Sequence, residues 1–275
     1  MRFLFIGDLM CHDEQLMAMK YGDNYNFDAS FGEIKDTFGK YDYVVCNLET
    51  VLTDGPYNGY PKFSTPKSFC GSAIKSGINC FMLANNHICD RGVNGVKSTI
   101  NYLESNDIAY TGVGVGVHSR PLLIGDVAIL NYTNKMNVND KDVIYNNLND
   151  ALSIKNDIEY SRKMGAKIVV AVVHWGNEYE FNHSREQESI ARQLVNMGVD
   201  VIIGSHPHVI QDIGNIQGRV VAYSLGNFLS SQMEEECKES IGVELDIDNG
   251  YIMKVRYLKF NIFEDNGIVK VKETN

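Results

Sequence analysis

The sequence predicts an α/β fold in which a mainly parallel sheet is followed by antiparallel C-terminal strands. Up to about residue 215, short β-branched apolar runs alternate with longer amphipathic segments, which is typical of α/β domains. After that point apolar and polar residues alternate with period two, as in strands with one solvent-facing side. Hydrophobic residues make up 44 % of the 275 residues, and no Pro-rich or Ser-rich linker divides them. We therefore expect residues 1–275 to form a single domain whose sheets pack on each other.

Five short apolar runs are typical of largely buried strands, at residues 2–6, 43–46, 79–83, 168–173 and 199–203. Between them, helices are expected at residues 31–38, 68–76, 93–105, 148–163 and 185–197. Gly77, Gly165 and Gly198 stand just after three of these segments, where a glycine commonly ends a helix. This alternation predicts parallel strands joined by helical crossovers.

The C-terminal strands are expected at residues 219–225, 242–247, 251–263 and 268–272. Asp-Asn-Gly occurs at 248–250 and again at 265–267, and Asn-Gly favours the tight turns of two-residue hairpins. Charged residues such as Glu244 and Lys254 alternate with apolar ones there. We therefore expect this part to be antiparallel, with one face in water.

Composition excludes several classes of function. The 25 Lys+Arg and 35 Asp+Glu give a net charge of −10, so a nucleic-acid partner is not expected. No apolar run reaches the ~20 residues that span a bilayer, and the N-terminal apolar run is too short for a signal peptide. Six cysteines without a C-x-x-C pair indicate reduced thiols. We expect a soluble, cytoplasmic protein.

Polar side chains follow five of the expected strands, at the point where each strand ends. They are Asp8, Asn47 with Glu49, Asn86 with His87, His174, and His206 with His208. Because open α/β folds place their sites at the carboxyl ends of the strands, we expect these side chains at one rim of one sheet.

Oxygen and nitrogen donors without a thiol suit Mn, Fe, Zn or Co. Six candidate ligands are too many for one tetrahedral ion: Asp8, Glu49, Asn86, His174, His206 and His208. Two ions about 3.5–4 Å apart with a shared carboxylate would use all six. In an extended segment, the two imidazoles of His206-Pro207-His208 would point to the same side and serve different ions.

Each of these residues also has a structural interpretation. Asp8 could end a strand as a turn residue, Glu49 could be solvated, and His87 could cap the following helix. His174 could simply end a core strand. His12, His118 and His183 are expected at the surface, while Trp175 and Tyr179 could equally be packing residues or walls of a pocket.

Six motifs together resemble the capsule synthesis protein CapA family, also called poly-gamma-glutamate biosynthesis proteins. They are Gly7-Asp8-Leu9-Met10, Asn47-Leu48-Glu49-Thr50, Ala84-Asn85-Asn86-His87, His174-Trp175-Gly176-Asn177-Glu178-Tyr179, Gly204-Ser205-His206-Pro207-His208 and Ser224-Leu225-Gly226-Asn227-Phe228. That family is similar to the calcineurin-like metallophosphoesterases. The resemblance implies a four-layer α/β/β/α sandwich with a binuclear metal site.

The resemblance also implies roles for single residues. Asp8 and His208 would bind one metal, Asn86, His174 and His206 would bind the other, and Glu49 would bridge the two. His87 would be the acid that protonates a leaving oxygen, after a metal-bound hydroxide attacks phosphorus. Further candidates, for substrate contact or support of the ligands, are His12, Asn47, Trp175, Glu178, Tyr179 and Asn227.

The sequence departs from the broader phosphoesterase pattern at the first two motifs. The usual Asp-x-His is replaced by Asp8-Leu9-Met10, and His12 is the candidate substitute for the missing imidazole. In the second motif, Glu49 offers a longer carboxylate than the usual Asp.

The function expected first is a binuclear metal-dependent hydrolase acting on an anionic small molecule or polymer. A non-hydrolytic component of the poly-gamma-glutamate synthesis machinery is the alternative that the family name favours, and Lys62, Lys67 and Arg91 are its candidate contacts to an anionic polymer. A metal-dependent amide hydrolase is the third, because a hydroxide between two metals attacks carbonyl groups as well as phosphorus.

Overall fold

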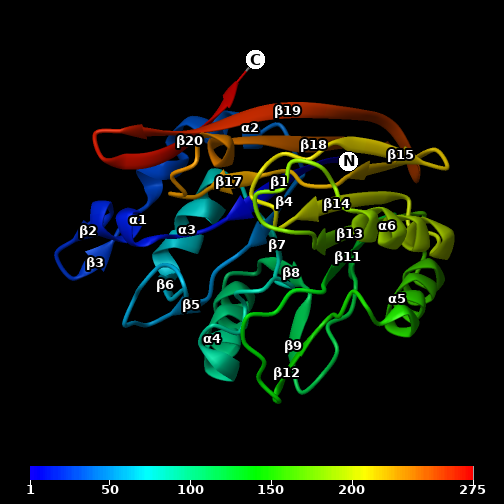
Figure 1. Cartoon of the computed structure of the whole chain (residues 1–275), viewed down its shortest axis with the longest axis horizontal. Helices are drawn as coiled ribbons and strands as arrows, with labels where there is room; N and C mark the ends of the chain where they lie inside the picture. The colour runs from blue at the N-terminus through cyan, green and yellow to red at the C-terminus, as the bar shows by residue number, and fades with distance from the viewer. Residues whose placement is uncertain (275) are drawn as a thin grey trace.

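The computed structural model describes residues 1–274, and two large β-sheets form its centre (Figure 1). The first sheet has eight strands in the order β20-β19-β18-β1-β4-β7-β8, with β17 also paired to β1. Its strands are β1 (Arg2–Leu9), β4 (Tyr43–Leu48), β7 (Cys80–Met82), β8 (Ala109–Thr111), β17 (Asn227–Leu229), β18 (Glu239–Asp248), β19 (Tyr251–Asp265) and β20 (Ile268–Thr274).

The second sheet has six strands in the order β10-β11-β13-β14-β16-β15. They are β10 (Leu122–Ile124), β11 (Val127–Thr133), β13 (Ile168–His174), β14 (Val201–Ser205), β15 (Ile213–Ile216) and β16 (Arg219–Ala222). Three two-stranded ladders complete the strands: β2 (Lys20–Tyr21) with β3 (Asn24–Tyr25), β5 (Leu52–Thr53) with β6 (Thr65–Pro66), and β9 (Val113–Val115) with β12 (Val143–Tyr145).

The helices connect and cover these strands. The α-helices are α1 (Asp13–Ala18), α2 (Lys35–Phe38), α3 (Lys67–Ser76), α4 (Gly92–Ser105), α5 (Ala151–Lys163) and α6 (Arg185–Met197), and the 3₁₀ helices are η1 (Asp28–Ile34) and η2 (Glu235–Lys238). Figure 1 shows α1 and α3 on the left of the molecule and α5 and α6 on the right.

An apolar layer lies between the two sheets. Phe3 and Phe5 of β1 pack there with Val170 and Val172 of β13, because alternate residues of a strand point to the same face. Leu4, between the two phenylalanines, points to the other face of its sheet and joins a second core with η1, α2, α3 and α4. A third core joins the second sheet to α5 and α6. The central strands of both sheets are therefore buried on two faces, as their continuous apolar runs predict, whereas the outer strands β19 and β15 are largely exposed.

The structure confirms parallel strands joined by helices but corrects the expectation of one sheet. Strands β1, β4 and β7 belong to the first sheet, whereas β13 and β14 belong to the second. A buried strand has the same continuous apolar run in whichever sheet it lies, so the pattern does not say which strands pair. The sequence analysis also missed the buried strand β11.

Two element predictions are wrong in detail. The predicted helix at 31–38 is a 3₁₀ helix to Ile34 followed by the short α2. The predicted antiparallel strand 219–225 ends at Ala222; it pairs antiparallel with β15, as expected, but parallel with β14. Strand β17 pairs parallel with β1. The antiparallel arrangement of β18, β19 and β20 is confirmed, with hairpin turns at both Asn-Gly pairs.

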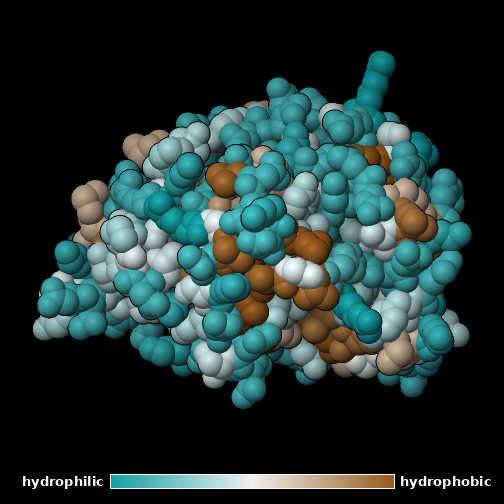
Figure 2. Space-filling model, turned by 90° about the horizontal axis from the view of Figure 1, so that it is seen from below, coloured by the Kyte–Doolittle hydropathy of each residue, from teal (hydrophilic) through white to brown (hydrophobic). Residues whose placement is uncertain are grey.

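Across residues 1–274, no helix is at once long and apolar enough to cross a bilayer. Figure 2 shows the face below the view of Figure 1, where hydrophilic residues surround an apolar patch near the middle. All six cysteines are free and buried, and burial raises the pKa of the Cys80 thiol. These thiols behave as small packing groups rather than as reactive ones.

Candidate metal centre

The carboxyl ends of strands from both sheets meet at one place. Asp8 lies near the end of β1 and Glu49 directly after β4 in the first sheet, while His174 ends β13 in the second. All three side chains are fully buried. The predicted ligands are thus brought together between two rims, not along the rim of one sheet.

Glu49 occupies the middle of this cluster. Its Oε1 lies 3.6 Å from His174 Nε2 and 3.8 Å from His208 Nε2, and it has no hydrogen-bond partner among the described residues. Burial, and then the negative charge of Asp8, raise the pKa of the Glu49 carboxyl well above its ordinary value. A buried carboxylate oxygen without a partner is costly unless a cation neutralises it.

Asn47 holds the two carboxylates in place. Its Nδ2 donates to Asp8 Oδ1 at 2.7 Å and lies 3.3 Å from Glu49 Oε2. Its Oδ1 accepts a hydrogen bond from Asn85 Nδ2 at 3.2 Å. Asn47 therefore contacts both candidate carboxylate ligands.

His174 is oriented through both ring nitrogens. Nε2 lies 2.9 Å from Asn86 Oδ1, and Nδ1 lies 2.9 Å from Ser205 Oγ. Burial, and then the neighbouring imidazoles of His206 and His208, lower the pKa of His174 well below its ordinary value. The ring is therefore neutral at physiological pH, which is the form that binds a metal.

His206 and His208 lie in a turn after β14, not in an extended segment as the sequence analysis assumed. Their backbone φ angles are 97° and 62°. Residues other than glycine seldom adopt positive φ angles, and those that do are often found at functional sites. The Nδ1 of His206 has no hydrogen-bond partner in the described chain. The Nδ1 of His208 lies 3.0 Å from Asn227 Oδ1 and 3.3 Å from Asp8 Oδ2.

His87 lies beside this cluster and pairs with an acid that the sequence analysis missed. Its Nδ1 is 2.7 Å from Asp90 Oδ2, and the same carboxylate accepts the backbone N–H of Phe63 at 2.7 Å. The only signal in the sequence was the spacing of three residues between His87 and Asp90. Ser205 was also missed, although it directly precedes His206.

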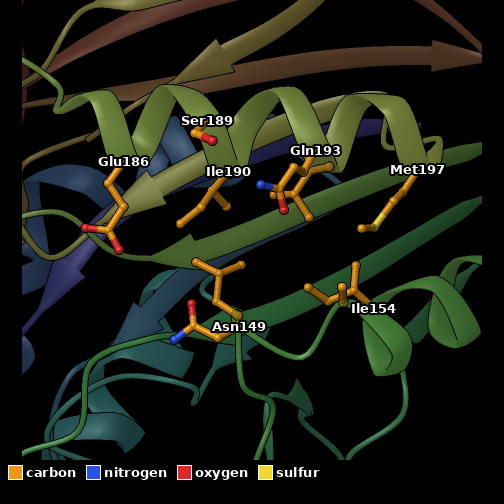
Figure 3. A pocket seen from close by; sticks show the side chains of 10 residues that line it. Asn149, Ile154, Glu186, Ser189, Ile190, Gln193 and Met197 are labelled. Atoms are coloured by element: carbon orange, nitrogen blue, oxygen red, sulfur yellow. The ribbon is translucent and has the colours of Figure 1, made fainter.

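A cavity of about 390 Å³ opens beside the cluster. Its walls include His87 and His208 together with three further candidates, His12, Glu178 and Tyr179. A separate cavity of about 300 Å³ lies between α5 and α6 (Figure 3). None of its lining residues belongs to the predicted site, so the cavity beside His208 is the candidate substrate site.

Of two other candidates, Trp175 lies in the core and His12 lies at the cavity. Trp175 is fully buried in the core against α5 and α6, where its Nε1 donates to Tyr223 O at 2.9 Å. Of the placements considered for Trp175, the structure therefore has the packing residue. His12 lines the cavity, and burial lowers its pKa to about 4.

The residues present fit two divalent cations. Two groups each bring three ligand atoms within 4.8 Å of one another, and Glu49 belongs to both: Glu49, His206 and His208 form one, and Asp8, Glu49 and His174 form the other. Carboxylates and neutral imidazoles are suitable donors for such ions. The unpartnered atoms Glu49 Oε1 and His206 Nδ1 are those that a cation would satisfy. His12 is in neither group.

Two capsule or PGA biosynthesis proteins are similar to most of this chain. The capsule biosynthesis protein CapA of Bacillus anthracis is 29 % identical over 274 residues, which cover 89 % of this chain and 64 % of the relative. The PGA biosynthesis protein CapA of Bacillus subtilis (strain 168) is 27 % identical over 264 residues, which cover 87 % of this chain and 66 % of the relative. The chain thus spans just under two thirds of the length of these relatives.

Two solved structures share the fold. A hypothetical protein from Thermus thermophilus matches with a TM-score of 0.58 and 16 % identity, covering 94 % of this chain and 98 % of that one. The Thermus thermophilus sulfate thiohydrolase SoxB in complex with glycerol matches with a TM-score of 0.56 and 11 % identity, covering 98 % of this chain and 56 % of that one.

A family model described as "Bacterial capsule synthesis protein PGA_cap" matches residues 2–232. Because this match covers most of the chain, the protein belongs to the bacterial capsule synthesis PGA_cap family, within the metallophosphoesterase-like superfamily.

Proposed function

We propose that this chain is a binuclear metal-dependent hydrolase that cleaves an anionic ester of the phosphoester type. Its scaffold is then the four-layer α/β/β/α sandwich of metallo-dependent phosphatases, formed by residues 1–275 as one domain. The observation that carries the proposal is the position of Glu49 Oε1, which lies within 4 Å of imidazoles from two donor groups and has no partner of its own within residues 1–274.

The proposed ligands divide between two ions. Asp8 and His208 hold one, Asn86, His174 and His206 hold the other, and Glu49 is shared. Bound there, Mn, Fe, Zn or Co would lower the pKa of water and neutralise charge on the ester. The close pairs Asp8–His208 and His174–Asn86 support this division. The two distance groups described above divide the residues differently, with His206 beside His208 and Asp8 beside His174, and both divisions share Glu49.

His87 is the proposed general acid. Asp90 fixes the ring through Nδ1, which leaves Nε2 as the nitrogen that can pass a proton to a leaving oxygen. The carboxylate also stabilises the positive charge of the protonated ring. Since Asp90 is itself held by the backbone N–H of Phe63, the ring keeps its orientation before substrate arrives.

Residues around the ligands keep the site preorganised. Asn47 joins Asp8 to Glu49, Ser205 orients His174, and Asn227 orients His208. Supports of this kind fix the tautomer and direction of each ligand, and losing one commonly costs metal affinity.

The test combines metal analysis with hydrolysis of bis(p-nitrophenyl) phosphate. We expect bound divalent metal in the purified protein, loss of hydrolysis after treatment with EDTA, and recovery when Mn²⁺ is added. His174→Ala should abolish both binding and recovery, whereas His183→Ala, at a partly exposed histidine paired with Asp212, should leave them unchanged. Protein without metal that stays inactive after Mn²⁺ addition would contradict the proposal.

A second candidate is a non-hydrolytic role in the synthesis machinery of poly-gamma-glutamate. It is favoured by the names of the Bacillus relatives, which are capsule and PGA biosynthesis proteins. If polyglutamate bound equally well to wild type and His174→Ala, the metal centre would not be the binding element. Cleavage of a γ-glutamyl amide in preference to a phosphodiester at equal concentration would instead indicate an amide hydrolase.

A further inference from the structure

The cavity beside the metal centre carries one sign of charge. Glu14, Glu178 and Glu234 line it, and all three side chains are exposed. None of its lining residues, within the described part of the chain, is Lys or Arg. An anionic group would therefore find no opposite charge in this cavity, whereas a cation would find three.

Two tyrosines complete the cavity. Tyr60 and Tyr179 line it and are 69 % and 46 % exposed, so their rings are accessible from the cavity side. Aromatic faces attract ammonium groups through their negative π surfaces. Carboxylates combined with exposed tyrosine rings are the chemistry that recognises an amine or a quaternary ammonium.

The cavity wall is connected to the metal centre by a continuous chain of hydrogen bonds. Asn227, which contacts His208, donates from Nδ2 to Gln232 Oε1 at 2.6 Å, and Gln232 Nε2 donates to Tyr179 Oη at 3.2 Å. The ring of Tyr179 lies 6.2 Å from that of His208, centroid to centroid. These hydrogen bonds hold Tyr179 in a fixed position relative to His208. A molecule bound at the metal centre that reaches into the cavity would therefore lie against a preorganised wall.

Burial, followed by the negative charges of Glu178 and Glu234, raises the pKa of Tyr179 to about 12. Both glutamates line the same cavity as the Tyr179 ring, and Glu178 precedes Tyr179 directly in the sequence. The basic residues that the sequence analysis considered for an anionic polymer lie elsewhere. Lys67 pairs with Asp54 at 2.8 Å, and neither it nor Lys62 nor Arg91 lines the cavity.

We propose that this cavity receives a positively charged arm of the substrate, an amine or a quaternary ammonium, while the anionic ester of the same molecule binds at the metal centre. This inference rests on the proposed function. A polymer of free carboxylates does not match the cavity, although the metals attract anions.

The test is calorimetric titration of Mn²⁺-loaded protein with three phosphate monoesters that differ in one group. They are phosphocholine, its isostere 3,3-dimethylbutyl phosphate, in which a neutral tert-butyl group replaces the quaternary ammonium, and 3-carboxypropyl phosphate, which carries a carboxylate instead. We expect phosphocholine to bind about tenfold more tightly than the isostere, from one cation–aromatic contact and weak ion pairs, and the carboxylate to bind most weakly. Glu234→Gln and Glu14→Gln should reduce the preference for phosphocholine, while Glu236→Gln, in the same segment as Glu234 but outside the cavity lining, should keep it.

Equal dissociation constants for phosphocholine and the isostere, or tighter binding of the carboxylate, would overturn the inference. An unchanged preference for phosphocholine in Glu14→Gln and Glu234→Gln would overturn the inference as well. Choline alone and inorganic phosphate alone separate this from the proposed function. Binding of choline without binding of phosphate would support the cationic cavity and contradict the phosphoesterase, and binding of phosphate without choline preference would do the reverse.

Discussion

Glu49 and Glu244 are both buried, at 0 % and 3 % exposure, but their surroundings are opposite. Glu244, in β18, accepts hydrogen bonds from Arg256 Nε at 2.8 Å and Tyr41 Oη at 2.9 Å. Burial pushes the pKa of Glu244 up, but the hydrogen bonds from Arg256 and Tyr41 outweigh it and lower the pKa. Glu49 has Asp8 beside it instead, and its pKa is raised.

The difference separates a carboxylate that stabilises the fold from one that is held ready for a ligand. A buried charge with its partners in the same chain contributes to stability, whereas one without them destabilises the protein until something binds. Glu49 is in the second situation. His206 resembles it only in part, because burial lowers the pKa of its imidazole and leaves a neutral ring whose Nδ1 has no partner among the described residues. Substitutions at the two glutamates should therefore change different properties.

The largest effect is expected for Glu49→Gln. The substitution keeps the shape but removes the charge shared by two metals, and several kcal/mol of charge stabilisation correspond to a loss of about 10³-fold in kcat/KM at roughly tenfold per 1.4 kcal/mol. The metal-free variant should unfold at a higher temperature than metal-free wild type, because a costly buried charge is gone. The measurements are hydrolysis of bis(p-nitrophenyl) phosphate and thermal unfolding in EDTA. A variant that lost both activity and metal-free stability would show that Glu49 is structural.

A smaller effect is expected for Asn227→Ala, which removes the acceptor facing His208 Nδ1. Loss of such a support typically weakens metal binding by about 10- to 100-fold. Titration of Mn²⁺ into the metal-free variant measures this. Asn215→Ala, an exposed asparagine in β15, is the control and should bind Mn²⁺ like wild type. Unchanged affinity in Asn227→Ala would mean that His208 needs no support, or is not a ligand.

Glu244→Gln should have the opposite effects to Glu49→Gln on activity and on stability. We expect full hydrolytic activity and a loss of about 1–2 kcal/mol in the free energy of unfolding, since a charge-assisted hydrogen bond contributes more than a neutral one. We expect no larger loss of unfolding free energy, because the side chains of Arg2 and Arg256 are 37 % and 41 % exposed and solvent weakens exposed ion pairs. Urea unfolding measures it. Reduced activity with unchanged stability would reverse the comparison.

The residues of the centre could be predicted because each one lies at the end of its strand or within a few residues after it. Asp8, His174 and His206 needed only the strand ends and the tendency of α/β folds to place sites there. The partners of these residues could not be predicted in this way, because contacts such as Glu49 with His174 join segments more than 100 residues apart. Whether a buried oxygen lacks a partner depends on every segment that approaches it.

The fold shows the same division between local and distant information. The hairpins of the C-terminal strands follow from adjacent Asn-Gly pairs, and Gly77 and Gly198 end their helices at positive φ. The distribution of β1 and β13 between two sheets depends on pairing, which buried apolar strands do not encode locally. The prediction for β16 is only half right for that reason, since the strand is antiparallel to β15 but parallel to β14.

The smallest expected effect is a pH dependence of opposite sign at the two glutamates, measured by urea unfolding of metal-free proteins. The folded-state pKa of Glu244 is lowered, so its contribution is present above its ordinary pKa and is lost as the pH falls through the lowered value. The stability advantage of wild type over Glu244→Gln should therefore hold at neutral pH and shrink as the pH falls below the ordinary pKa of a glutamate.

At Glu49 the folded-state pKa is raised, so its contribution is present below its ordinary pKa and is lost as the pH rises towards the raised value. Wild type should therefore fall behind Glu49→Gln as the pH rises above the ordinary pKa of a glutamate, whereas it gains on Glu244→Gln only below that pKa. Adding Mn²⁺ should reverse the order for Glu49, because the charge then has a partner, and should leave the order for Glu244 unchanged. Suppose instead that the stability difference between wild type and variant changed with pH in the same direction for both glutamates without metal. The charge of Glu49 would then not destabilise the metal-free protein, and nothing at that position would require a cation.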